Sequence, residues 1–360
     1  MENRSIIISE HLKEDTGSFN EQNLHTCELH LNLWKSSTRP KFKSLITEYK
    51  LDIGIKIFKY GKELDKLYFY FPFKINSIED LGKRIGEKGS ELISTIFNDT
   101  YTATDENDSL FKYQLKEDNS EAFYLTELGK GDWKILDKDN WRYSGSLLEI
   151  ALSEAVADKV GNNALYIRFR LSLSKQDALE FIRSEENLSN DVIQAVFSKV
   201  ELYDIRINDR RETDSKVLQD IEDNKHSTLL KFNKVHFFFM TDIHDKVSNG
   251  NFERMDSRIL EADKWNSYIE NFTTNTEIAY HWKKKADKDF ESFEVFYKDI
   301  CNNRNYWKIL WYFFIVINLG AIGSLFASIN FPLNHMDWDG GIVVLIMTIV
   351  DFLIFVMCNL

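Results

Sequence analysis

Histidine and aspartate side chains gather around one apolar run of the sequence. His236, Asp242, His244 and Asp245 flank the run 237–240. Imidazole nitrogens and carboxylate oxygens bind divalent metal ions, and such side chains can converge where a buried strand ends. A polar turn after a buried strand explains the same residues equally well. The pattern is therefore a candidate metal site, but by itself it does not lead us to predict a bound metal or any other cofactor.

Three arginines form a second candidate site. Arg168 and Arg170 lie on one face of a predicted strand, and Arg206 lies in another. A guanidinium group donates two parallel hydrogen bonds to a phosphate or a carboxylate, so a converging set would form a pocket for an anionic ligand. The alternative is an ordinary solvent-facing sheet surface, on which arginines pair with neighbouring acids.

Common catalytic motifs are missing from the sequence. It contains no G-x-x-x-x-G-K-[ST], G-x-G-x-x-G, G-x-S-x-G or H-E-x-x-H pattern. The cysteines, Cys27, Cys301 and Cys358, are far apart and form no C-x-x-C unit, which is typical of a reducing compartment. We therefore predict that the chain is not an enzyme.

The charge of the chain bears on its partners. Acidic residues outnumber basic ones by 57 to 45, which gives a net charge of −12. A domain of this sign has no bulk attraction for nucleic acid, so we expect no direct nucleic-acid binding. A cytoplasmic sensor protein or a protein–nucleic-acid complex is the kind of partner that this charge allows.

Alternating apolar residues predict a β-sheet that positions the candidate sites. Apolar side chains recur at every second position in 29–33, 53–57, 164–171 and 200–208. Such alternation is typical of strands with one buried and one polar face. We therefore expect substantial, mainly antiparallel sheet.

Helical periodicity appears between the predicted strands. Apolar residues recur at helical spacing over 77–97 and 146–160, which predicts an α+β cytoplasmic domain rich in antiparallel sheet. The predicted divisions are a β-rich subdomain over 1–140, an α+β subdomain over 141–275, a helical stalk over 276–308 and a transmembrane hairpin over 309–360.

Two apolar stretches at the end of the chain predict the hairpin. Each of 309–329 and 341–360 is about as long as the roughly 30 Å hydrocarbon core of a bilayer requires. Arg304 and Lys308 precede the first stretch, whereas the 330–340 loop has no basic residue. The positive-inside rule then predicts a two-pass protein of the inner membrane with both termini in the cytoplasm.

Polar and small residues inside the hairpin predict contacts between helices. Asn318 and Asp351 lie at the same predicted depth, and a carboxylate there needs a partner or a proton. Small residues on one helix allow close approach of a neighbouring protomer, so a homo-oligomer is expected. The predicted hairpin and oligomer contacts are Asn318, Gly320, Gly323, Ser324, Ser328 and Asp351.

The layout resembles membrane effectors of prokaryotic anti-phage defence. The resemblance covers architecture alone: a sheet-rich domain followed by the spans 309–329 and 341–360. It implies an abortive-infection effector that converts a cytoplasmic signal into hairpin oligomerisation and disruption of the lipid bilayer. The alternative is a non-lytic membrane scaffold that holds a partner complex at the inner membrane.

Overall fold

The computed structural model describes residues 4–13, 25–38, 46–60, 64–97, 99–107, 109–117, 122–137, 141–185, 198–249, 256–260, 265, 268–269, 277–302 and 306–330. The chain divides into two units, residues 1–185 with 200–301 and residues 186–199 with 302–360. The sheets of the first unit thus extend across the boundary predicted near residue 140.

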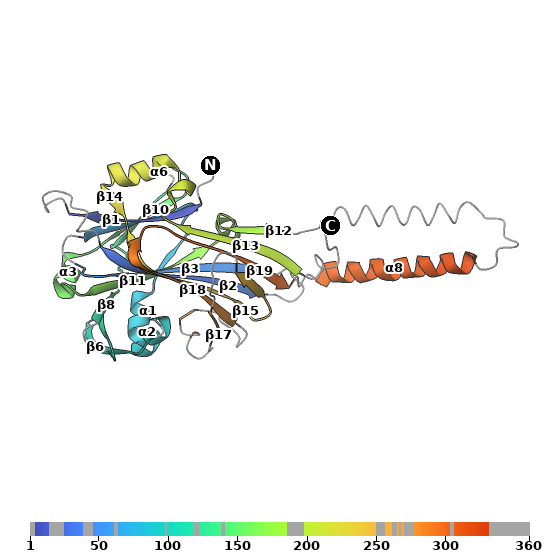
Figure 1. The fold of residues 1–360 in the computed structure, drawn as a ribbon, viewed down its shortest axis with the longest axis horizontal. Coiled ribbons are helices and arrows are strands. Elements are labelled where there is room, and N and C mark those ends of the chain that lie inside the picture. The colour runs from blue at the N-terminus through green and yellow to red at the C-terminus, as the bar shows by residue number, and fades with distance from the viewer. Residues whose placement is uncertain are drawn as a thin grey trace. The chain divides into compact units, whose positions relative to one another are not determined.

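Two mixed β-sheets account for the strands that the structure describes (Figure 1). The first sheet runs in the order β16 (Lys246–Asn249), β19 (Phe293–Asn302), β13 (Ser198–Ile207), β1 (Ser5–Leu12), β4 (Leu64–Phe71), β10 (Ser146–Ala151) and β9 (Trp133–Leu136), with β12 (Ile182–Glu185) beside β13 and β14 (Ser227–Leu229) beside β1. The second runs in the order β17 (Asp256–Ile259), β18 (Glu277–Phe290), β15 (Lys231–Asp242), β2 (Thr26–Thr38), β3 (Ile46–Ile57), β11 (Ala164–Leu173), β8 (Ala122–Thr126), β7 (Leu110–Leu115) and β6 (Tyr101–Asn107), with β5 (Ile78–Asp80) beside β11.

Most described helices are short. They are α1 (Gly82–Lys88), α2 (Ser90–Phe97), α3 (Glu154–Val160), α4 (Lys175–Ala178), η3 (Arg210–Glu212), α6 (Ser215–Gln219), η4 (Asp220–Asn224) and the longer α8 (Tyr306–Asn330).

The main core lies between the two sheets. Alternating apolar residues of β2 and β3, such as Leu31 and Ile53, are fully buried there, as the sequence alternation predicted. Phe69 of β4 and Phe169 of β11 meet across the core, with ring centroids 5.2 Å apart. The two sheets therefore pack face to face.

The opposite face of the second sheet is also buried. Leu81 and Ile85 at α1, Ile93 of α2 and Tyr268 pack with Tyr166 of β11 in a second apolar cluster. Polar residues that alternate with the core residues of β2, β3, β11 and β15 are thus covered rather than solvated. This cover creates the buried polar site described below.

The predicted fold class is corrected to a mixed, sheet-rich domain. Parallel pairing is described for β1 with β13, for β2 with β15 and for β8 with β11. Parallel partners need long connections, and alternation within one strand does not reveal the direction of its neighbour. The sequence pattern therefore found strands but not the mixed pairing.

Two segments predicted as helices contain strands. The predicted stalk, 276–308, forms β18 and β19 over 277–302, where Val295 and Tyr297 are buried at alternate positions. Residues 146–160 form β10 followed by α3. In both segments aromatic and branched residues fit a pleated surface as well as a helix.

The predicted transmembrane hairpin is also corrected. Within the described part of the chain, no helix has the length and apolar character that crossing a bilayer requires. This finding contradicts the predicted two-pass location in the inner membrane. The second predicted span, 341–360, lies outside the described residues.

The predicted oligomer contacts are only partly described. Gly320, Gly323, Ser324 and Ser328 lie on α8, and the side-chain amide of Asn318 donates to the carbonyl oxygen of Phe314, 2.7 Å away. Asp351 lies outside the described residues. Contact between protomers stays a prediction.

Candidate metal centre

Strand register brings the candidate ligands together. In the parallel pair of β2 and β15, His30 lies opposite His236, and Glu28 lies opposite Lys234. Glu28 and His30 are two residues apart on one strand, so both side chains point to the same face of the sheet. That face is the covered one, and the exposed fractions of Glu28, His30 and His236 are 6%, 2% and 8%.

The three side chains converge on one point, the carboxylate of Glu28. Its Oε1 lies 3.0 Å from His30 Nε2 and 3.2 Å from His236 Nε2. One possible ligand atom from each of the three residues lies within 4.8 Å of the ligand atoms of the other two. In a tetrahedral zinc site with bonds of about 2.0–2.1 Å, neighbouring ligand atoms lie about 3.3 Å apart. The spacing therefore fits a first-row transition metal.

Burial sets the protonation states of the cluster. It lowers the pKa of His30 below its ordinary value and lowers the pKa of His236 to about 4. Burial disfavours the charged form of Glu28, but the contacts with His236 and His30 outweigh it and hold the pKa of Glu28 below its ordinary value. At neutral pH the group thus offers two neutral imidazoles and one carboxylate, which are the forms that bind metal.

Neighbouring groups orient the two imidazoles. His30 Nδ1 lies 3.2 Å from the Tyr166 hydroxyl, and His236 Nδ1 lies 2.8 Å from Nε2 of His281. Without a metal, His30 Nε2 must carry the proton, because it donates to the Glu28 carboxylate. Metal binding would need the proton on Nδ1 of each imidazole, where the Tyr166 oxygen and His281 Nε2 could accept it, and would leave the Nε2 lone pairs for the ion. Such contacts fix the tautomer of metal-binding histidines in many proteins.

Among the residues that the structure describes, one nitrogen of the cluster makes no aligned hydrogen bond. His236 Nε2 is buried and, despite its 3.2 Å distance from Glu28, makes no aligned hydrogen bond. A buried polar atom without a partner costs about 1–3 kcal/mol. A metal ion between His236 and Glu28 would remove this cost.

Lys234 competes for the same carboxylate. Its Nζ lies 2.9 Å from Glu28 Oε1, and its side chain is 27% exposed. The ammonium group satisfies Glu28 when no cation is bound. Because the side chain reaches solvent, it can turn outward when a metal takes its place. Within the described residues the group provides three ligands, which leaves a fourth position for water or another donor.

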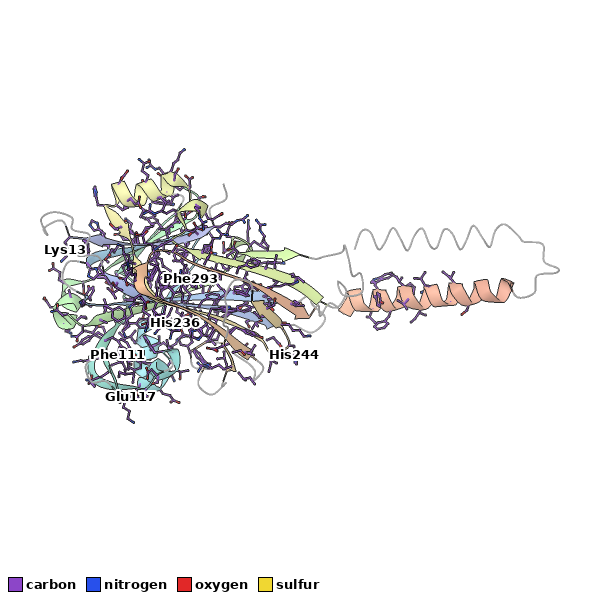
Figure 2. All side chains as sticks on the ribbon, in the orientation of Figure 1. Lys13, Phe111, Glu117, His236, His244 and Phe293 are labelled. Atoms are coloured by element: carbon purple, nitrogen blue, oxygen red, sulfur yellow. The ribbon has the colours of Figure 1, made fainter. Side chains whose placement is uncertain are left out.

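The metal candidates predicted from the sequence lie in different places. His236 belongs to the cluster, whereas the backbone N–H of His244 donates to Asp242 in the turn after β15. Asp245 accepts from Thr241 and contacts Lys35, away from His236. Figure 2 shows His236 well inside the sheets and His244 near their end. Of the four residues that the sequence singled out, His236 alone belongs to the cluster.

The predicted anion pocket is divided between two environments. Arg168 and Arg170 are buried and face Asp52, which accepts from Arg170 Nε at 2.6 Å and from Arg170 Nη2 at 3.0 Å. The hydroxyl of Tyr268 accepts from Arg168 Nε at 2.7 Å. These guanidinium groups are committed to partners within the domain.

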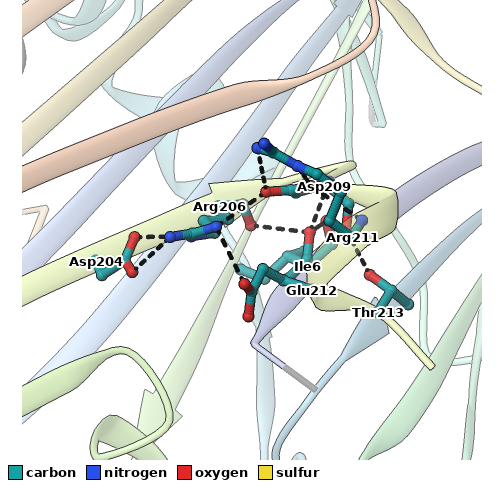
Figure 3. A network of polar contacts seen from close by, with 8 residues as sticks. Ile6, Asp204, Arg206, Asp209, Arg211, Glu212 and Thr213 are labelled. Carbon is teal, nitrogen blue, oxygen red and sulfur yellow. Dashed lines mark hydrogen bonds and ion pairs between the residues drawn. The ribbon is translucent and has the colours of Figure 1, made fainter. Parts of the chain in front are cut away.

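Arg206 lies in the other sheet. It contacts Asp204 at 3.0 and 3.1 Å, Asp209 at 3.1 Å and Glu212 at 3.5 Å (Figure 3). Four carboxylate contacts satisfy the guanidinium, and the side chain is only 23% exposed. Arg206 is thus paired with neighbouring acids, whereas Arg168 and Arg170 lie on a buried face, where Arg168 donates to tyrosine hydroxyls.

The sequence analysis missed Glu28 and His30. His30 lies within the alternating segment 29–33, and Glu28 lies just before it. One residue separates them, so both side chains lie on the same face of the strand. Their meeting with His236 depends on parallel pairing across more than two hundred residues. No local pattern contains that information.

No protein-family model matches the chain, and no curated protein matches it either. The residues of the cluster are therefore the basis for any functional assignment.

Proposed function

We propose that this chain is a metal-binding protein that takes up one transition-metal ion, with Zn²⁺ the best fit, through Glu28, His30 and His236. The observation that carries the proposal is the convergence of two neutral imidazoles and one carboxylate at ligand spacing, with one buried nitrogen unpaired. Two histidines and one glutamate form a known set of zinc ligands.

The ion would act on the fold. Glu28 and His30 belong to β2, and His236 belongs to β15, so a bound metal joins two central strands of the second sheet. Anything that binds the folded state and not the unfolded chain raises the free energy of unfolding. The closed surroundings favour a stabilising or regulatory ion over a catalytic one.

Calorimetric titration of the metal-free full chain with Zn²⁺ at pH 7 tests the proposal. We expect one ion per chain, and we expect His30→Ala or His236→Ala to weaken binding by at least about 100-fold, because losing a ligand costs more than losing a neighbour of a ligand. His244→Ala is the matched control, since this exposed histidine lies outside the cluster. Equal loss of affinity in all three variants would mean that Zn²⁺ binds surface histidines.

The effector and scaffold roles remain predictions that nothing described here tests, as do the lipid, oligomer and sensor partners. Both roles need a transmembrane anchor. The metal proposal does not depend on either.

A further inference from the structure

A second polar cluster lies at one end of the core between the two sheets. Lys35, near the end of β2, reaches across to the first sheet, where Glu201 of β13 and Asp299 and Cys301 of β19 surround it. Asp245 joins from the turn after β15. Lys35 and Asp299 are 6% and 0% exposed, whereas Cys301 is half-buried.

Lys35 is held in one place by several contacts. Its Nζ lies 2.7 Å from Asp299 Oδ2, 3.0 Å from Glu201 Oε2 and 3.3 Å from Asp245 Oδ2. Burial disfavours the ammonium, but the surrounding carboxylates outweigh it and raise the pKa of Lys35. The ammonium is therefore fixed beside Cys301.

The separation between Lys35 and Cys301 is the unusual feature. Nζ lies 2.7 Å from the sulfur. Sulfur is larger than oxygen, yet this separation is below the roughly 2.9 Å that is usual for N–H···O hydrogen bonds. It is close to the separation of two atoms joined through a single bridging oxygen.

We propose that Lys35 and Cys301 are a modification site, at which a peroxide oxidant joins the two side chains through an N–O–S bridge. This inference is independent of the metal proposal, because it uses none of the metal-binding residues. The bridge would connect β2 of the second sheet to β19 of the first.

The reaction balances with two molecules of hydrogen peroxide. The first oxidises the thiol: R–SH + H₂O₂ gives R–SOH + H₂O, with an S–O bond formed and the O–O and S–H bonds broken. Burial raises the pKa of Cys301, so this step is slow and proceeds through the small thiolate fraction that the Lys35 ammonium stabilises. The second oxidises the nitrogen: R′–NH₂ + H₂O₂ gives R′–NHOH + H₂O, with an N–O bond formed and the O–O and N–H bonds broken. Condensation then forms the bridge: R–SOH + R′–NHOH gives R–S–O–NH–R′ + H₂O, with the S–OH and O–H bonds broken and a new S–O bond formed. Sulfur and nitrogen each lose two electrons, and the two peroxides accept all four.

Asp299 accepts the proton that the Lys35 ammonium must first lose. Its Oδ2 lies 2.7 Å from Nζ, and its buried Oδ1 has no hydrogen-bond partner within the described part of the chain. Burial raises the pKa of Asp299, so this carboxylate takes up a proton more readily than an exposed one. The transfer is uphill, because the surrounding carboxylates also raise the pKa of Lys35, so only a small fraction of Lys35 is a neutral amine beside the oxidised sulfur at any time.

Intact mass spectrometry of the full chain tests the proposal. A Cys27→Ser/Cys358→Ser chain leaves Cys301 as the sole thiol, so disulfides within the chain are excluded. After treatment with hydrogen peroxide we expect a gain of about 14 Da, one oxygen less two hydrogens, that dithiothreitol reverses. Proteolysis should then release one cross-linked fragment that contains both Lys35 and Cys301.

Lys35→Arg in the same background is the matched variant, because it keeps the positive charge and lacks the primary amine. We expect it to give no gain of 14 Da. If Lys35→Arg fails to fold, the test rests on the Cys27→Ser/Cys358→Ser chain that retains Lys35, and the presence or absence of its cross-linked fragment supports or overturns the proposal. A gain of only about 16 or 32 Da, or a loss of about 2 Da, with no oxygen bridge in the fragments, would overturn the proposal.

Discussion

Replacing Asp52 with alanine will lower the free energy of unfolding by about 3–5 kcal/mol, because the change leaves two buried guanidinium groups without their carboxylate. Asp52 is 0% exposed and accepts hydrogen bonds from Arg170, from Trp34 Nε1 at 2.8 Å and from the Tyr268 hydroxyl at 2.8 Å. The cationic groups beside it outweigh its burial and lower its pKa.

Urea denaturation followed by circular dichroism measures this loss. Asp204→Ala is the matched control, because Asp204 also makes two contacts with an arginine, Arg206, but is 32% exposed. Exposed pairs contribute about 0–1 kcal/mol, so the control should change little. Equal losses in the two variants would show that the buried network is not a special source of stability.

Acidification from pH 6.5 to about 4 is expected to destabilise the metal-free domain through its buried histidines. Burial lowers the pKa of both His236 and His281 to about 4, from an ordinary value of 6.5. In this window the unfolded chain binds protons that the folded chain does not, so stability falls as the pH falls. Each histidine can contribute up to about 3 kcal/mol at roughly 1.4 kcal/mol per pKa unit. Their mutual contact prevents simple addition.

Comparison of variants isolates this effect. Glu277 acts in the opposite direction, because burial raises its pKa to about 8 and the folded state then binds the extra proton. His281→Gln keeps a polar side chain that does not titrate, so the stability lost between pH 6.5 and 4 should shrink. The measurement is the urea midpoint at a series of pH values. An unchanged pH profile in His281→Gln would show that His281 does not contribute to the loss of stability on acidification.

The sequence revealed strands better than it revealed their surroundings. Alternation correctly placed strands at 29–33, 53–57 and 164–171, because one face of each is apolar. It also suggested a solvated opposite face, which is wrong for Arg168 and Arg170. Their cover comes from α1, α2 and Tyr268, which are remote in the sequence. Burial of a polar face is a tertiary property that local periodicity does not contain.

The candidate site shows the same limit. His236 stood out because it begins an apolar run, and the residues after that run seemed to be its partners. The structure instead pairs it with His30 and Glu28 through parallel register, and with His281 across β18. Metal-ligand spacing in one segment is informative when all ligands come from one turn. Here they come from distant strands.

The most direct test of the metal proposal is anomalous X-ray diffraction at the zinc absorption edge from crystals of the full chain prepared with Zn²⁺. We expect one strong peak between Glu28, His30 and His236, at about 2.0–2.2 Å from their ligand atoms. A zinc peak only elsewhere, or no peak at this cluster with Lys234 still bound to Glu28, would contradict it.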